Sequence, residues 1–120
     1  MAVFLDHMTV YTSDKMASAE FFGRVFGAKR QDLRRDFAPV QMNDGLTVNF
    51  EEAESFKRGH YAFRVTDAEF DAILGRLKTA GVPFGSNTTG HDGEVYARGG
   101  LRGFYFDDPS GHGLEVITPE

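Results

Sequence analysis

The sequence predicts an α+β fold built from two tandem βαβββ modules. Two observations support this prediction: an internal repeat of a strand–helix pattern, and a hairpin-rich segment after each copy of it. The chain has 120 residues, which suits one domain. We expect module one to span about 1–53 and module two about 54–120 of that single domain.

The repeat opens with a histidine and an alternating strand. The first copy reads HMTVYTSD from His7 to Asp14, and the second reads HYAFRVTD from His60 to Asp67. Alternation of apolar residues is typical of a strand with one buried face. The closing Ser/Thr-Asp pair supplies a side-chain oxygen that can cap the first turn of a helix. Each copy therefore predicts a strand that leads directly into a helix.

Helical periodicity follows both copies. Apolar and small residues recur at three- and four-residue spacing after Asp14 and again after Asp67, and the two runs end at Gly27 and Gly81. Glycine readily adopts the left-handed conformation just past a helix C-terminus. The two copies therefore share a βα unit of nearly the same length.

The rest of each half predicts strands and turns. The sequence 43–45 (Asn-Asp-Gly) is a hairpin turn before a strand at 46–51. In the second half, a strand at 101–107 is followed by a turn at 108–111 and a last strand at 114–117. The βα units alone would also suit a parallel Rossmann-like sheet. The hairpins, and the lack of a glycine-rich phosphate loop after the first strand, count against it.

Two polar segments interrupt this pattern. Residues 85–100, GSNTTGHDGEVYARGG, make the second copy longer than the first and are rich in turn formers. We expect a long mobile loop there, of the kind that covers a site. The arginine-rich stretch 29–35 is interrupted by acidic residues, so we expect it to form a solvated face.

Composition excludes several classes of function. The formal charge of −5 and the pI of about 5.3 argue against nucleic acid as a partner. The absence of cysteine excludes a disulfide framework, a thiolate nucleophile and a cysteine-based zinc site. The first segment acquires charge at Asp6 and then alternates, so we expect no membrane association and a cytoplasmic protein.

The two histidines that open the repeats are candidate metal ligands. Glu115 lies four residues after Gly111, and the same count from Gly45 reaches Asn49. If a pseudo-twofold axis relates the copies, all four positions converge. Two imidazoles and a carboxylate on one side of a cation form a facial triad with open coordination positions. The alternative is that each histidine is a hydrogen-bonded structural residue, but their shared place in the repeat favours a metal.

Other polar residues surround these positions. Arg64 shares a strand face with His60, so it either binds a substrate carboxylate or forms a salt bridge. We expect His112, in the tight turn, to be structural. We expect His91 to be an exposed loop residue; the alternative is an acid or base that acts when the loop closes.

Three stretches resemble the vicinal-oxygen-chelate superfamily: DHMTVYTSD, GHYAFRVTDAEF and FYFDDPSGHGLEV. That group includes glyoxalase I, bleomycin-resistance proteins, extradiol dioxygenases and fosfomycin-resistance thioltransferases. The resemblance covers nearly the whole chain, and its most specific part is the ending at 108–115. It implies a curved mixed sheet around a cavity, a metal held by His7, His60 and Glu115, and a homodimer.

The resemblance also implies a function. We expect a glyoxalase- or dioxygenase-like metalloenzyme in which a divalent metal acts as a Lewis acid on a small oxygenated substrate. Iron, manganese, nickel, cobalt and zinc would all accept these ligands. Asn49 could add a fourth ligand. Thr9 and Tyr105 fall where the thioltransferases contact substrate, and with Arg64 they form the candidate catalytic set.

Two alternatives remain open. One is a metal-free protein of the bleomycin-resistance type that sequesters a small-molecule antibiotic. The other is a fosfomycin-type thioltransferase, although the loop that carries the phosphonate-binding lysine in those enzymes is not recognisable here.

Overall fold

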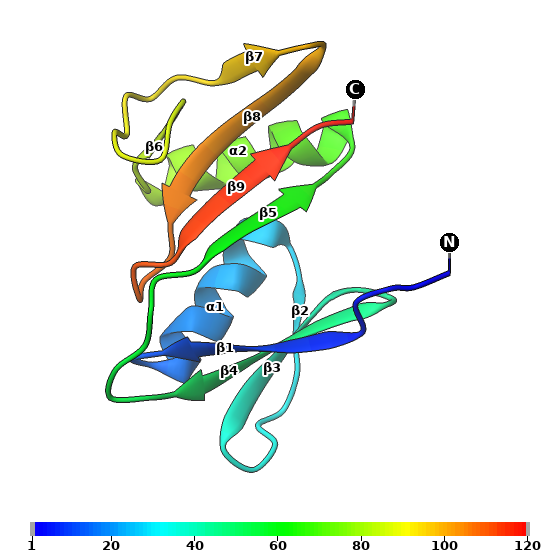
Figure 1. Cartoon of the computed structure of the whole chain (residues 1–120), viewed down its shortest axis with the longest axis vertical. Coiled ribbons are helices and arrows are strands. Elements are labelled where there is room, and N and C mark those ends of the chain that lie inside the picture. Colours follow the sequence, from blue (N-terminus) through cyan, green and yellow to red (C-terminus); the bar gives the residue numbers. More distant parts are fainter. Residues whose placement is uncertain (1, 120) are drawn as a thin grey trace. The chain divides into compact units, whose positions relative to one another are not determined.

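Each copy of the repeat folds as a strand, a helix and further strands in a computed structural model that describes residues 2–119 (Figure 1). Two units, Met1–Lys57 and Arg58–Glu120, each contain one copy. The α+β fold of two βαβββ modules is therefore confirmed. The first unit contains β1 (His7–Thr12), α1 (Lys15–Phe26), β2 (Lys29–Arg30), β3 (Phe37–Asn43) and β4 (Leu46–Glu52). The second contains β5 (His60–Arg64), α2 (Asp67–Ala80), β6 (Phe84–Gly85), β7 (Tyr96–Arg98), β8 (Leu101–Asp107) and β9 (Gly113–Ile117).

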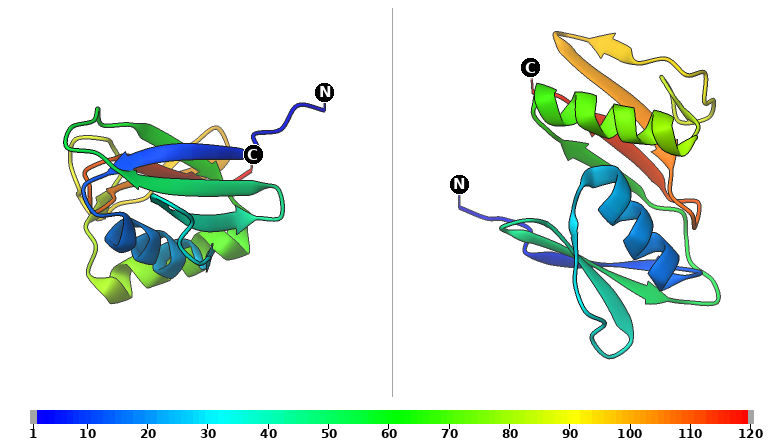
Figure 2. Two further views of the ribbon diagram at one scale, coloured as in Figure 1. Left: turned by 90° about the horizontal axis from the view of Figure 1, so that it is seen from below. Right: turned by 180° about the vertical axis from the view of Figure 1, so that it is seen from behind.

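The sheet of the first unit has the strand order β1-β4-β3-β2. Strand β1 runs parallel to β4, and the other pairs are antiparallel. Helix α1 covers one face of this sheet (Figure 2) and buries Phe22 and Val25 against it. The ring of Phe22 packs edge-on against Phe50 with a centroid distance of 4.8 Å. The core of this unit fills the space between α1 and the sheet, so the opposite face is free for polar side chains.

The second unit repeats this topology with the order β5-β9-β8-β6, and β7 also pairs with β8. Strand β5 runs parallel to β9. Helix α2 buries Phe70, Ile73 and Leu77 on one face of the sheet (Figure 2). The ring of Phe70 lies 5.0 Å from that of Phe104. Here too, one face of the sheet is left without a covering helix.

The helices end as the sequence predicts, but their first residues differ between the copies. The side chain of Asp14 caps α1 by accepting a hydrogen bond from the backbone of Ala17. Helix α2 is capped by Thr66, and Glu69 completes a capping box with it. The residue of the first copy that corresponds to Glu69 is Met16, which has no carboxylate, so Asp14 caps α1 instead. Gly27 and Gly81 both adopt left-handed conformations, with φ of 67° and 71°. Across residues 2–119, no helix is long and apolar enough to cross a membrane.

The segment 85–100 is more ordered than a plain loop. Its residues 96–98 form β7, which pairs with β8 so that Tyr96 faces Gly103. Before β7, the Asp92 carboxylate accepts hydrogen bonds of 2.9 Å from the backbone N–H of Ser86 and 2.6 Å from its hydroxyl. The expectation of a long loop is thus corrected at its C-terminal end, because cross-strand pairing with β8 overrides the local turn-forming composition.

Candidate functional site

His60 and Glu115 lie side by side on the uncovered face of the second sheet. Ala62 stands opposite Glu115 in the β5–β9 ladder, so His60 points to the same face from two residues earlier. Nε2 of His60 is 3.1 Å from Oε1 of Glu115. Two ligands of one divalent cation are separated by about 3 Å. This pair therefore fits the coordination sphere of a metal ion.

Tyr96 holds the other oxygen of this carboxylate. Its hydroxyl donates a hydrogen bond of 2.5 Å to Oε2 of Glu115. The tyrosine ring lies over Gly103, where an added Cβ would overlap it, and the Arg98 guanidinium is 4.7 Å from the ring centroid. Burial and the Glu115 carboxylate both raise the pKa of Tyr96. The phenol is therefore a proton donor at neutral pH.

Tyr105, a residue that the sequence assigned to the site, flanks the same carboxylate. It pairs directly with Glu115 across β8 and β9. Its ring centroid lies 6.0 Å from that of His60 and 5.7 Å from that of Tyr96. Burial, followed by a hydrogen bond to Glu115, raises the pKa of Tyr105. We call these four residues (His60, Tyr96, Tyr105 and Glu115) the Glu115 cluster.

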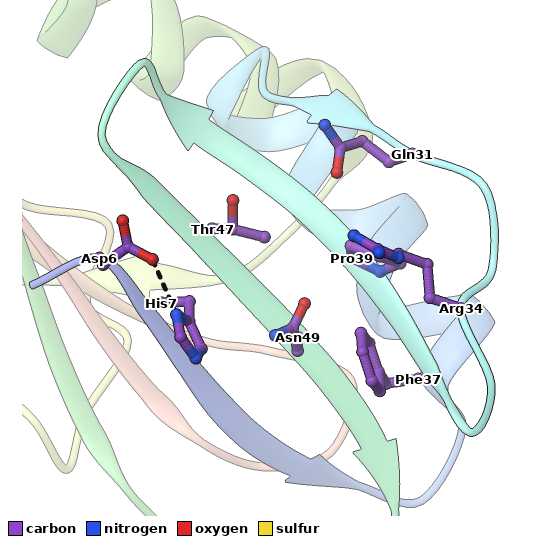
Figure 3. Close-up of a pocket in the computed structure, with 8 residues that line it drawn as sticks. All are labelled: Asp6, His7, Gln31, Arg34, Phe37, Pro39, Thr47 and Asn49. Carbon is purple, nitrogen blue, oxygen red and sulfur yellow. Dashed lines mark hydrogen bonds and ion pairs between the residues drawn. The ribbon is translucent and has the colours of Figure 1, made fainter.

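His7 lies in a pocket on the uncovered face of the first sheet (Figure 3). Nδ1 of His7 is 2.8 Å from Oδ2 of Asp6. When Nδ1 carries the proton of this bond, Nε2 has a free lone pair, which is the form that binds metals. The pocket has a volume of about 350 Å³ and is lined by Asp6, His7, Gln31, Arg34, Phe37, Pro39, Thr47 and Asn49.

Asn49 occupies the place in the first unit that Glu115 occupies in the second. In the β1–β4 ladder Asn49 stands opposite Thr9, two residues after His7. In the β5–β9 ladder Glu115 stands opposite the residue two after His60. The correspondence expected from the turn counts is therefore present in the strand register. Thr9 is exposed on the same face as His7.

Arg64 and His91 lie at the margin of the second sheet. Arg64 is exposed at the end of β5, on the same face as His60, and forms no ion pair with any of residues 2–119. Nε2 of His91 is 3.9 Å from Oδ2 of Asp107, the last residue of β8. Neither side chain contacts the Glu115 carboxylate.

His112 is structural, as expected. Its side chain is buried, and its Nδ1 accepts a hydrogen bond of 2.8 Å from the backbone N–H of Gly59. Its own backbone N–H donates to Oδ1 of Asp108 at 2.8 Å. These bonds tie the turn after β8 to the chain that enters β5, the strand that begins with His60.

The predicted ligands are distributed over both units. The second unit contains His60 and Glu115, whereas His7 and Asn49 belong to the first. Within residues 2–119, no group of three or more His, Asp or Glu side chains forms a ready metal site. The donor types nevertheless fit a divalent cation, since imidazole nitrogen and carboxylate oxygen suit iron, manganese, cobalt, nickel and zinc.

Tyr96 and Arg98 were not predicted from the sequence as site residues. Both lie in a segment that its glycines and polar residues marked as a loop. One sequence signal indicates them: Tyr96 and Arg98 are two residues apart, as on one face of a strand, and Gly103 lies in the strand that follows the next turn. A glycine inside a strand pattern often marks the close approach of another group.

Comparisons with known proteins cover nearly the whole chain. Residues 4–116 match the Glyoxalase/Bleomycin resistance protein/Dioxygenase superfamily. The structure resembles Oxidase ChaP-H2 with a TM-score of 0.91 and 35% identity, covering 100% of this chain and 96% of that one. It resembles Oxidase ChaP-H1 with a TM-score of 0.87 and 36% identity, covering 99% and 98%. By sequence, the chain is 27% identical over 119 residues to Glutathione transferase FosA of Serratia marcescens, covering 93% of this chain and 78% of that protein.

Proposed function

Because this chain belongs to the Glyoxalase/Bleomycin resistance protein/Dioxygenase superfamily, we propose that it is a metal-dependent oxidase acting on a small oxygenated substrate. The observation that carries the proposal is the 3.1 Å approach of His60 Nε2 to Glu115 Oε1 on an uncovered sheet face. Within the family, the identity of 35% and 36% to two oxidases favours oxidation over the other reactions.

Three residues would hold the metal. His60 and Glu115 supply a nitrogen and an oxygen from one sheet face, and His7 supplies Nε2, because its Nδ1 is engaged by Asp6. Asn49, in the position equivalent to Glu115, is available as a weak fourth ligand. A divalent metal bound there supplies Lewis-acid and redox chemistry to the oxygens of a substrate.

The protein's own side chains orient the reacting groups. The Tyr96 hydroxyl fixes the Glu115 carboxylate, leaving Oε1 directed at His60. Tyr105 is protonated at neutral pH, and its single O–H can turn from Glu115 to donate a hydrogen bond to a substrate oxygen. We assign Thr9 and Arg64, exposed on the faces that bear the two histidines, to substrate contact.

The first experiment is elemental analysis of untagged protein purified without chelator. We expect near-stoichiometric divalent metal in the wild type and its loss in His60→Ala and Glu115→Ala. His91→Ala is the matched control, since that histidine contacts Asp107 and not Glu115. A wild type that holds no metal and takes none up on titration would contradict the proposal and favour a metal-free sequestering protein.

Activity is tested by oxygen consumption. We would reconstitute the protein with iron(II), manganese, cobalt, nickel or zinc and offer a panel of catechols, hydroquinones and hydroxyketones. We expect oxygen uptake with at least one redox-active metal, and none with zinc or with Glu115→Ala. Conversion of hydroxyketones or dicarbonyls that needs no oxygen would instead assign an isomerase or lyase.

A second candidate is thiol transfer to fosfomycin. Thiol transfer is favoured by the 27% identity to Glutathione transferase FosA. The likeness to Fosfomycin Resistance Protein FosX from Mesorhizobium loti, with a TM-score of 0.74 and 25% identity over 100% of this chain and 95% of that one, supports fosfomycin as the substrate but does not bear on the reaction. Loss of free glutathione in the presence of fosfomycin and manganese would support thiol transfer over oxidation.

Mixing of variants tests whether His7 joins the other ligands within one chain or from a second copy. His7→Ala and His60→Ala preparations would be unfolded together and refolded as a mixture. Metal binding that returns in the mixture, but in neither variant alone, indicates a site shared between two chains of a homodimer. Metal binding that stays absent in a mixture containing mixed dimers indicates a site within one chain.

A further inference from the structure

The pocket around His7 contains an arginine whose backbone is held in a tight turn. The backbone N–H groups of Arg34 and Phe37 each donate to the other residue's carbonyl at 3.0 Å. Between them, Arg35 has a φ of 53°, and within residues 2–119 it is the only residue other than glycine with a positive φ. Such a conformation is rare for a long side chain and persists where the surroundings demand it. The turn makes Arg34 and Phe37 cross-strand neighbours on one face.

That face is the pocket face. Phe37 and Pro39 alternate along β3, and Pro39 stands opposite Asn49. Gln31 completes the wall, because its N–H donates to the Pro39 carbonyl at 3.0 Å and its side-chain amide donates to Gln41 Oε1 at 3.2 Å. In Figure 3, Asn49 lies between His7 and the Arg34–Phe37 side of the pocket, in keeping with the strand order β1-β4-β3.

The positive charge of Arg34 is not neutralised by a carboxylate of this pocket. Its guanidinium forms no ion pair with any of residues 2–119. The one carboxylate among the lining residues, Asp6, is already bonded to His7. A guanidinium presents a rigid fork of N–H groups that matches a carboxylate with two parallel hydrogen bonds. Phe37 and Pro39 offer apolar surface beside that fork.

We propose that this pocket binds a small organic acid, with its carboxylate on Arg34 and its apolar body against Phe37 and Pro39. The inference rests on the proposed oxidase function and names its substrate class: an oxygenated molecule that also carries a carboxylate. Every residue of the arginine-rich stretch 29–35 is exposed, as expected of a solvated face, and the turn at 35–36 places Arg34 along the wall of the pocket.

The test uses benzoate as the probe and metal-free protein. Binding is followed by NMR through the backbone amides of 31–41 and the side-chain amides of Gln31 and Gln41. We expect saturable benzoate binding to the wild type. Benzamide, a neutral molecule of similar shape, should bind more weakly by about tenfold or more, because it lacks the charge.

Two variants separate a direct contact from general charge. Arg34→Gln should weaken benzoate binding about tenfold or more. Arg35→Gln, which removes the same charge from the same turn, should leave it unchanged. Arg34→Lys should give an intermediate value, since a lysine keeps the charge but loses the fork.

Several results would overturn the inference: no benzoate-dependent shifts in the wild type, equal binding of benzoate and benzamide, or equal weakening by Arg34→Gln and Arg35→Gln. Metal content measured on the same preparations keeps the two proposals separate. If the wild-type protein takes up no metal, the oxidase proposal is wrong. If only the benzoate results fail, while the wild type and Arg34→Gln both take up metal, this inference is wrong and the oxidase proposal stands.

Discussion

The two oxygens of Glu115 have different partners: Oε2 accepts a 2.5 Å hydrogen bond from the Tyr96 hydroxyl, whereas Oε1 lies 3.1 Å from Nε2 of His60. A carboxylate held in this way presents a single oxygen to a cation. Residues that hydrogen-bond to a metal-ligating side chain fix its orientation and tune its basicity, and removing them typically weakens metal binding. Tyr96 is therefore a positioning residue for the proposed metal site.

Tyr96→Phe should weaken metal binding about tenfold to a hundredfold, because Glu115 becomes free to rotate. The measurement is the metal Kd by calorimetric titration of apoprotein. Tyr61→Phe is the control, since the Tyr61 ring packs against His112 with a centroid distance of 5.7 Å, away from the Glu115 carboxylate. Unchanged affinity in Tyr96→Phe would mean that this hydrogen bond has no part in metal binding.

Gly103→Ala should weaken metal binding as Tyr96→Phe does, by displacing the ring. An alanine Cβ at 103 would overlap Tyr96, so the ring must move away from Glu115. In a Tyr96→Ala background the same substitution has nothing to displace and should have little further effect. Equal effects of Gly103→Ala in the two backgrounds would assign its influence to the β8 backbone instead.

Stability above neutral pH should depend on Tyr96. Burial and Glu115 raise the pKa of this phenol above its ordinary value of 10.0, so folding favours the protonated form. Its contribution to the free energy of unfolding is complete below pH 10 and is lost as the pH rises through the folded-state pKa. Urea unfolding across this range should show the wild type and Tyr96→Phe converging at high pH. A constant difference between them would contradict the assigned donor role.

Metal removal should destabilise the fold. A metal that binds only the native state, at a free concentration a hundredfold above its Kd, adds about 2.7 kcal/mol to the free energy of unfolding. We expect a chelator to lower the urea midpoint of the wild type and to leave that of Glu115→Ala unchanged. If the chelator shifted both midpoints equally, the stabilising metal would bind somewhere other than at Glu115.

The sequence alone determined the repeat and the place of each candidate ligand within it. Three local signals predicted the elements that the structure shows. They are the alternation within the strands that begin with a histidine, the helical spacing after Asp14 and Asp67, and the glycines at the helix ends. The equivalence of Asn49 and Glu115 also followed from the sequence, because counting from a turn fixes the strand face on which a residue lies.

The tertiary structure decided which side chains meet. Tyr96 reaches Glu115 only because β7 pairs with β8 over Gly103, and Arg34 faces the His7 pocket only because a left-handed Arg35 closes the turn beside it. Neither contact has a periodic signature. Both depend on pairing between segments whose local composition indicates loops, so only the register of the assembled sheet could place them.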